Sequence, residues 1–243
     1  MAEPVYVAVN CVETRLQLVM GSQTGVLWSE TFNSAGGSMP LLAPSLRRGL
    51  RFCSIEPAQL SGIAYVRGPG SFTGLRVALA HVLGLARAAN LSTAGLDYLP
   101  LLACTPAALL DSCLWCIVHS RKKQVYAQRF VCPSGKADGP AGVYSVPDMR
   151  RALERENKCA LFGSGVTRNP ELVPDSRSVS VLPAFLNDPP AGVLIREAAC
   201  ADYGQGFSPL LYLRPSDAEE NLDSIAAARG LDLDQARKQV LGE

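Results

Sequence analysis

Gly68-Pro69-Gly70-Ser71-Phe72-Thr73-Gly74-Leu75-Arg76 is a glycine-rich turn that leads directly into a long apolar helix. The preceding run, Gly62-Ile63-Ala64-Tyr65-Val66, has the composition of a buried strand. Many α/β proteins place a strand, a glycine turn and a helix in this order at the edge where a ligand or partner binds. The glycines and the proline require a sharp turn and let another group approach the backbone closely. The stretch therefore predicts an α/β protein with a functional edge at this turn.

Neither of the two common phosphate-binding motifs fits this turn. A P-loop requires Gly-Lys-Ser/Thr, but Leu75 and Arg76 follow Gly74. The dinucleotide motif G-x-G-x-x-G would need a glycine where Thr73 stands. The alternative interpretation is a tight structural turn in which Ser71 or Thr73 caps the helix.

The helix expected at 73–89 has no polar face. One side carries mostly large apolar residues, and the other carries small ones: Leu75, Ala78, Leu79, Val82 and Ala86 against Val77, Ala80, Gly84 and Ala88. A helix that is apolar nearly all round is buried on both sides. We therefore expect one side to pack on the sheet and the other to meet a neighbouring helix or a second subunit.

Composition restricts the class of protein. The chain has 243 residues, a formal net charge of +1 and a sequence pI near 7.5, so its overall electrostatic field does not favour nucleic acid. We see neither a signal-peptide pattern nor an apolar run long enough to span a bilayer, and we expect a cytoplasmic protein without a membrane partner. The eight cysteines are scattered, which is typical of buried thiols rather than a disulfide framework.

Candidate chemical groups are few. His81 and His119 are the only histidines, which excludes a His-rich metal site. Cys113 and Cys116 form a C-x-x-C, but in a strand residues three apart point to opposite faces.

A pattern of a strand hairpin followed by a helix occurs loosely twice along the chain. Strands are expected at 5–9, 16–20, 26–28, 93–96, 114–118 and 124–130, and helices at 39–52, 99–110, 147–156 and 191–203.

Two basic clusters stand out in this nearly neutral chain. Arg121, Lys122 and Lys123 lie at a predicted hairpin tip, which is either a solvated turn or an RNA contact. The second cluster lies on one face of the 39–52 helix and consists of Arg47, Arg48 and Arg51. These arginines could line the rim of an interface.

The segment from Gly62 to Gly84 resembles the one by which the TsaB (YeaZ) family is recognised: a strand, then R-G-P-G-S-F-T-G-x-R, then a helix of small residues. Residues 67–74 and Arg76 match this motif. Weaker similarities follow in chain order, at Ser120-Arg121 with Gln124-Val125-Tyr126, at Phe162-Gly163-Ser164-Gly165 and at Leu211-Tyr212-Leu213-Arg214-Pro215. The resemblance covers about residues 5–215.

This resemblance implies a fold and a role. The fold would be α/β, with two tandem actin/Hsp70/sugar-kinase-like (ASKHA) domains whose mixed sheets are flanked by helices. We expect these domains at 1–103 and 104–215, followed by a charged helical tail at 216–243. The role would be that of a non-catalytic scaffold that activates a TsaD-type transferase in N6-threonylcarbamoyladenosine modification of tRNA next to the anticodon. A TsaE-type ATPase would join the complex, and tRNA would be bound through it.

The family pairs through the helix after the glycine turn and the helix before the preceding strand. We therefore expect a partner interface, shared with a homodimer, at Leu42, Leu46, Leu75, Ala78, Leu79, Val82 and Leu83. The turn itself would be structural, built from Gly68, Gly70, Ser71, Thr73, Gly74 and Arg76.

Two departures from the family pattern bear on catalysis. Asn10 and His119 stand where the family usually has aspartates, and in this superfamily acidic residues on two hairpins hold Mg²⁺ and nucleotide phosphates. We therefore expect no catalytic residue, no metal and no cofactor in this chain, with ATP and Mg²⁺ belonging to partner subunits. The alternatives are an active ATP-dependent kinase or hydrolase of the superfamily and a tRNA-binding module that uses Arg121, Lys122 and Lys123.

Overall fold

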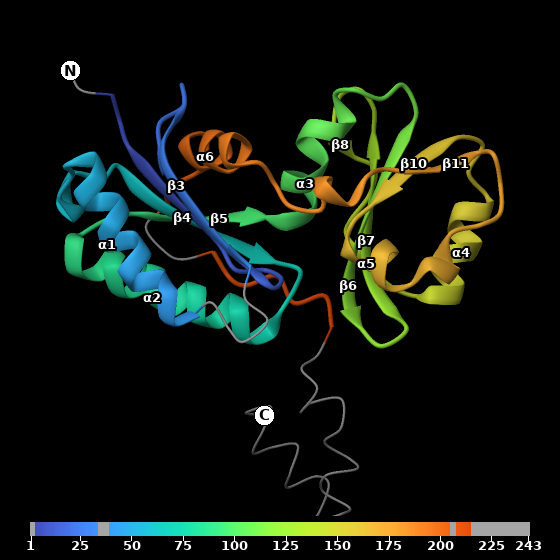
Figure 1. The fold of residues 1–243 in the computed structure, drawn as a ribbon, viewed down its shortest axis with the longest axis horizontal. Coiled ribbons are helices and arrows are strands. Elements are labelled where there is room, and N and C mark those ends of the chain that lie inside the picture. The colour runs from blue at the N-terminus through green and yellow to red at the C-terminus, as the bar shows by residue number, and fades with distance from the viewer. Residues whose placement is uncertain (1–2, 34–38, 205–207, 215–243) are drawn as a thin grey trace, which may run out of the picture. The chain divides into compact units, whose positions relative to one another are not determined.

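The computed structural model describes residues 3–33, 39–204 and 208–214 (Figure 1). By its internal contacts the chain forms two units, Met1–Leu211 and Tyr212–Glu243. Only Tyr212–Arg214 of the second unit are described. The predicted tail at 216–243 lies outside the described residues.

The first sheet contains five strands in the order β3-β2-β1-β4-β5. The strands β1, β2 and β3 form an antiparallel meander, whereas β4 and β5 run parallel to β1. Their bounds are β1 Tyr6–Asn10, β2 Arg15–Gly21, β3 Val26–Asn33, β4 Gly62–Gly68 and β5 Thr93–Asp97. The β3 strand alternates between exposed and half-buried residues because it is the edge of the sheet.

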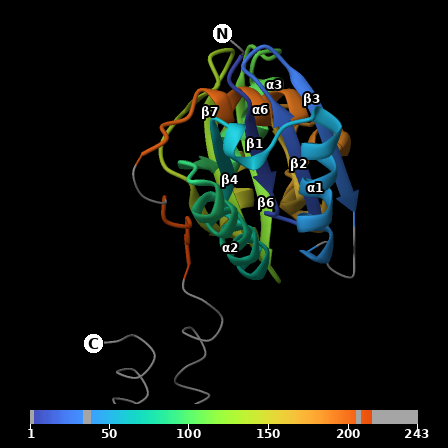
Figure 2. The same cartoon turned by 90° about the vertical axis from the view of Figure 1, so that its left-hand side faces the viewer.

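Helices cover both faces of this sheet. The α1 (Leu42–Cys53) and α2 (Phe72–Ala89) helices share one hydrophobic core with the sheet and lie together on one face (Figure 2). On the other face lie α6 (Ala191–Ala199), which contacts β1, β2 and β3, and α3 (Tyr98–Ala107). The expected helices at 39–52 and 73–89 are thus confirmed, the first with a short 3₁₀ turn, Met39–Leu41, ahead of it.

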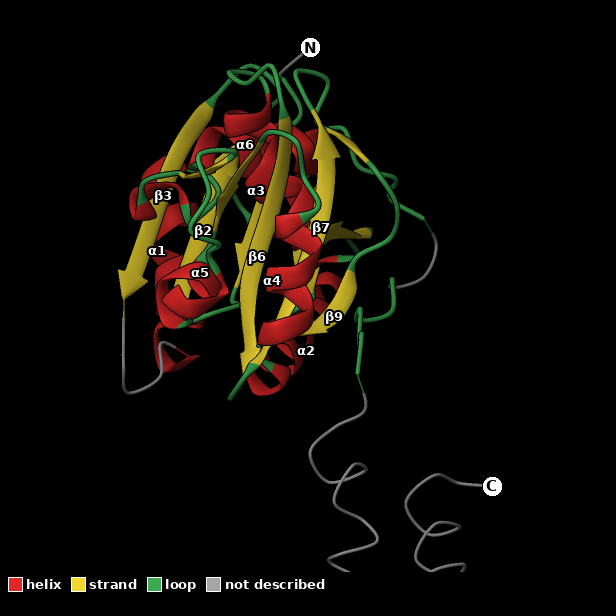
Figure 3. Cartoon of the chain, turned by 90° about the vertical axis from the view of Figure 1, so that its right-hand side faces the viewer, coloured by secondary structure: helices red, strands yellow, loops and turns green. Residues whose placement is uncertain are grey.

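The second sheet repeats the first (Figure 3). Its order is β11-β10-β6-β7-β8, with β9 also paired to β7, so a hairpin is again followed by two parallel strands. The strands are β6 Cys113–Arg121, β7 Gln124–Val131, β8 Lys136–Ala137, β9 Gly142–Ser145, β10 Cys159–Phe162 and β11 Val179–Val181. The repeated order confirms the predicted ASKHA fold class.

The helices of the second sheet complete this repeat. The α4 (Val146–Glu154) and α5 (Ser164–Arg168) helices pack on the sheet, while α3 contacts β6 and β7 as well as β4 and β5. Short 3₁₀ turns occur at Pro57–Gln59, Pro170–Leu172 and Ala184–Leu186. Because α6 returns from the end of the second sheet to the first, the two halves are interleaved. The predicted domain boundaries at 103 and 215 stay predictions.

The glycine turn is packed against the β1–β2 turn. The Ser71 N–H donates a hydrogen bond to the Val12 carbonyl at 2.7 Å. A Cβ atom on Gly70 would come within 2.6 Å of the same carbonyl oxygen, and one on Gly74 would collide with the carbonyl oxygen of Cys11. These two glycines therefore provide the space in which two backbone turns touch, rather than a cradle for phosphate.

The other residues of the turn form the N-terminal end of α2 and the backbone that leads into it. Ser71 is the N-cap, since its hydroxyl accepts the Gly74 N–H at 3.2 Å, whereas Thr73 is exposed. Gly68 has φ +114°, a backbone conformation that favours glycine. The Arg76 guanidinium lies 3.7 Å from the centre of the Phe72 ring. These contacts explain the local structure of the turn, and its purely structural role stays a prediction.

The two glycines of α2 provide a matched test of this packing. Gly74→Ala should destabilise the chain by about 1–3 kcal/mol because the added methyl group meets backbone that cannot rotate away. Gly84→Ala should stabilise it by up to about 1 kcal/mol, since no atom lies within 4 Å of the new Cβ. Urea unfolding of both variants measures the difference, and equal effects would contradict this account.

Candidate functional site

The structure corrects four of the seven residues predicted to form the partner interface. Leu42, Leu75, Ala78 and Val82 are each only 1% exposed, because they point from the two helices into the core below. Buried side chains cannot contact a partner, so these four stabilise the fold instead. The other three are half-buried, and their place in an interface stays a prediction: Leu46, Leu79 and Leu83.

The opposite side of α2 is exposed and carries a row of small residues. Ala80, Gly84 and Ala88 lie on this side, and Gly84 has open space where its side chain would be. An exposed glycine within a helix costs about 1 kcal/mol of helix stability relative to alanine, and nothing within the described chain packs on it. By length and composition this helix is also apolar enough to cross a membrane. Its larger residues, however, lie in the core of the first sheet.

A polar network begins at the end of β1, where the family usually has an aspartate. The Asn10 amide donates to Gln17 Oε1 at 2.7 Å and accepts the Val12 N–H at 3.1 Å. Gln17 in turn donates to the Pro189 carbonyl at 3.0 Å. Asn10 and Gln17 are both buried. The two side chains therefore join the first hairpin to the segment before α6.

Glu13 is the carboxylate at the tip of the same hairpin, and it contacts the second half of the chain. It accepts hydrogen bonds from the Ser164 hydroxyl and, at 3.0 Å, from the Tyr98 hydroxyl. The Ser164 hydroxyl also accepts the His119 N–H at 2.9 Å. Burial raises the pKa of Glu13, although the two hydroxyl groups oppose this shift. A single carboxylate thus connects β1–β2, α3 and α5.

Two further contacts close the same region. The Arg15 guanidinium lies 2.7 Å from the Asp188 carboxylate, whose pKa is raised by burial. The Asn187 amide accepts the Gly163 N–H at 2.9 Å and donates to the Thr167 hydroxyl at 3.3 Å. The polar groups between the β1–β2 hairpin and the start of α5 are therefore bonded to one another.

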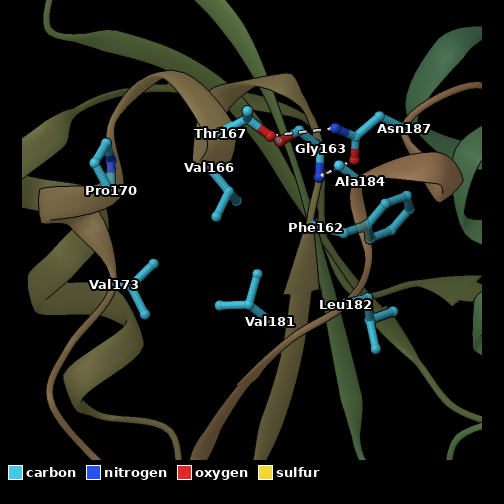
Figure 4. Close-up of a pocket in the computed structure, with 10 residues that line it drawn as sticks. All are labelled: Phe162, Gly163, Val166, Thr167, Pro170, Val173, Val181, Leu182, Ala184 and Asn187. Atoms are coloured by element: carbon cyan, nitrogen blue, oxygen red, sulfur yellow. Dashed lines mark hydrogen bonds between the residues drawn. The ribbon is translucent and has the colours of Figure 1, made fainter.

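A pocket of about 300 Å³ lies beside the Gly163 turn (Figure 4). It is lined by Phe162, Gly163, Val166, Thr167, Pro170, Val173, Val181, Leu182, Ala184 and Asn187. Most of this lining is apolar, and the Asn187 amide, its most polar group, is already bonded to Gly163 and Thr167. The pocket therefore offers an apolar surface with little hydrogen-bonding capacity for orienting a ligand.

The glycines of the Gly163-Ser164-Gly165 turn are explained by packing. A Cβ atom on Gly163, whose φ is +119°, would collide with the Ile117 carbonyl oxygen, and one on Gly165 would lie 3.0 Å from it. The turn needs both glycines because α5 starts directly against β6. This close approach accounts for the G-x-G pattern without a ligand.

The residues of this region do not fit a bound Mg²⁺ ion. Hard cations prefer several carboxylate oxygens. Asn10 is an amide that is fully engaged, and Glu13 accepts two hydroxyl groups. Burial and the nearby Arg168 lower the pKa of His119, whose Nδ1 atom has no hydrogen-bond partner in the described part of the chain. Among the described residues, no three His, Cys, Asp or Glu side chains are grouped to hold a metal ion.

The other predicted groups lie elsewhere. Lys122 and Lys123 form the exposed two-residue turn of the β6–β7 hairpin, and Arg121 Nε donates to Gln124 Oε1 at 2.8 Å. Their contact with RNA stays a prediction. Cys116 is fully buried, whereas Cys113 lies beside Glu156 at 3.4 Å, which agrees with their expected opposite faces.

Glu13, Tyr98, Ser164 and Asn187 were not among the predicted site residues. Glu13 alone has a sequence signal, since it is the acidic residue in the turn that follows the first strand. The partners of Glu13 come from segments about 85 and 151 positions away, so no local pattern reveals them.

The raised pKa of Glu13 predicts a pH effect on stability. Since the folded state holds this proton more tightly than the unfolded state, folding is favoured below the ordinary carboxyl pKa of 4.5 and disfavoured as pH rises through the raised value. Relative to Glu13→Gln, the unaltered chain should therefore lose unfolding free energy as the pH rises from 4.5 towards neutrality. Urea unfolding across this range measures the difference; a constant difference, or one that grows with pH, would contradict the assignment.

Comparisons with known proteins agree with this architecture. The family model of TsaD, tRNA N6-adenosine threonylcarbamoyltransferase, matches residues 39–143, which is less than half of the chain. No curated protein matches the chain in sequence. Among solved structures, YeaZ from Pseudomonas aeruginosa is similar with a TM-score of 0.63 and 21% identity, covering 96% of this chain and 97% of YeaZ.

A second solved structure is described as an uncharacterized protein with similarity to peptidase YEAZ from Pseudomonas aeruginosa. It is similar with a TM-score of 0.69 and 20% identity, covering 87% of this chain and 100% of that chain. At this level of identity the two structures establish the shared fold. The TsaD-family match adds a sequence relationship over α1, α2 and the β6–β7 hairpin. Together, these findings show a TsaD-family relationship over residues 39–143 and a fold shared with YeaZ.

Proposed function

We propose that this chain is a non-catalytic subunit that binds and activates a TsaD-type transferase in the N6-threonylcarbamoyladenosine modification of tRNA next to the anticodon. The match to the TsaD family and the similarity to YeaZ support a role in this modification. The observation that carries the scaffold role is the outer face of α2, where Ala80 and Gly84 are exposed without any packing partner in the described chain.

A close helix–helix contact explains this face. Small residues four positions apart let the backbone of a second helix approach closely, which larger side chains would prevent. The partner would be a catalytic paralogue of the same fold, and a second copy of this chain would compete for the same face. A TsaE-type ATPase and tRNA would join through the complex, and the assembly would be cytoplasmic.

The same proposal assigns nucleotide chemistry to the partner subunits. Asn10 and Glu13 are committed to internal hydrogen bonds, and His119 replaces the second carboxylate. Calorimetric titration of the isolated chain with ATP and Mg²⁺ should therefore give no binding heat. Binding together with turnover by the chain alone would favour the alternative, an ATP-dependent kinase or hydrolase of the superfamily.

Ala80→Arg tests the docking face directly. The long charged side chain would occupy the space that a partner helix needs, so binding to the TsaD-type protein should fall by at least about tenfold, or about 1.4 kcal/mol. Light scattering or sedimentation of the mixture measures the loss. Because Ala80 is exposed, the fold of the isolated chain should be unchanged.

The matched control is Leu109→Arg, which adds the same side chain at a position that is 82% exposed and outside α1 and α2. It should leave binding intact. Cells that lack this chain should also lose N6-threonylcarbamoyladenosine from tRNA. Normal modification in those cells, with no TsaD-type protein retained on the tagged chain, would refute the proposed function.

A further inference from the structure

The two helices on the outer face of the first sheet carry positive charge only. Five arginines lie on α1 and α2, and neither helix contains an aspartate or a glutamate: the arginines are Arg47, Arg48, Arg51, Arg76 and Arg87. The whole chain has a formal net charge of only +1. Positive charge is therefore concentrated on the two helices that cover this face of the sheet.

The arginines of α1 differ in their partners. Arg48 is neutralised by Glu30 on β3, with contacts of 2.9 Å and 2.5 Å, and it also donates to the Ser45 hydroxyl. Arg47 and Arg51 are exposed and form no ion pair within the described residues. They lie one helical turn apart on the same side of α1, so their guanidinium groups can contact one surface together.

The surface around these two arginines is hollowed. Both side chains line a hollow of about 530 Å³ and a second of about 450 Å³. Glu56 lines the larger hollow without pairing with either arginine in the described chain. Phe52, next to Arg51, is 72% exposed. Exposed arginines on a hollowed surface, with an exposed aromatic residue on the same helix, are typical of protein interfaces.

We propose that Arg47 and Arg51 bind carboxylate side chains on the docking helices of the partner protein, and that this charge pairing selects the partner over a second copy of this chain. The inference rests on the proposed function, since it names the chemistry of the partner's surface. In a two-fold dimer through this face, Arg47 and Arg51 of the two copies would lie on the shared interface and repel one another. A partner with acidic residues at these places gains attraction instead.

A protein surface accounts for these features better than RNA does. Phosphate binding would explain the arginines. It does not explain why small residues occupy the exposed positions 80, 84 and 88 of α2. Close helix packing explains these small residues. RNA binding at this face is therefore the outcome that competes with the proposal in the test.

The test is charge reversal by R47E/R51E, with K122E/K123E as the matched control because it changes the net charge equally on a separate exposed turn. The probe is the TsaD-type protein, titrated at low and high salt, with circular dichroism to verify folding. R47E/R51E should weaken binding by at least about tenfold at low salt and remove most of its salt dependence, whereas the control should bind normally. Added salt should increase self-association of the unaltered chain, because salt screens the repulsion between the arginines of two copies.

Each other outcome has a defined meaning. If Ala80→Arg abolishes binding but R47E/R51E does not, or if both charge-reversal variants weaken it equally, the charge pairing is refuted while the proposed function stands. If R47E/R51E instead loses tRNA binding and keeps the protein partner, the face binds RNA and the inference is wrong. If the unaltered chain binds no TsaD-type protein, the proposed function fails and this inference fails with it.

Discussion

The contact between two backbone turns positions most of what this chain presents to its surroundings. The Ser71 N–H and the glycines at 70 and 74 hold the start of α2 against the Cys11–Val12 turn. Because α2 starts there, Leu75 and Val82 face the core, whereas Ala80 and Gly84 face outward. Glycine is needed at this contact since any side chain would separate the turns and rotate or displace the helix. The proposed docking face therefore depends on an interaction at the start of its own helix.

The same β1–β2 turn carries the contacts that bind the first hairpin to the rest of the chain. In the superfamily, two hairpins contribute acidic groups to a metal and phosphates, but here the first hairpin is bound to the second half of its own chain. Glu13 contacts Ser164 and Tyr98, and Gln17 contacts Pro189. These hydrogen bonds also fasten the two sheets of Met1–Leu211 to each other. The side chains of this turn therefore hold the packed chain together, which is the property that the proposed docking role requires.

Much of the fold could be predicted from local patterns. Hairpin, strand and helix periodicity located α1, α2 and the β6–β7 hairpin to within a few residues, since each has a strong local signal. The interface prediction failed at Leu42, Leu75, Ala78 and Val82 because a helix that is apolar on all sides does not reveal which side faces the core. The network around Glu13 was missed because its partners are distant in sequence. Burial and long-range contacts are properties of the packed chain, and only the structure specifies them.

The rate of threonylcarbamoyl transfer by a TsaD-type protein, measured with and without this chain in a reconstituted reaction, tests the central claim most directly. The account predicts a large increase in rate when the chain is added, with no activity from the chain alone. It also predicts that the increase saturates as the two proteins reach equal amounts, because one docking face binds one partner. An unchanged rate, or transfer by this chain in the absence of the partner, would contradict the claim that it activates the enzyme without being one.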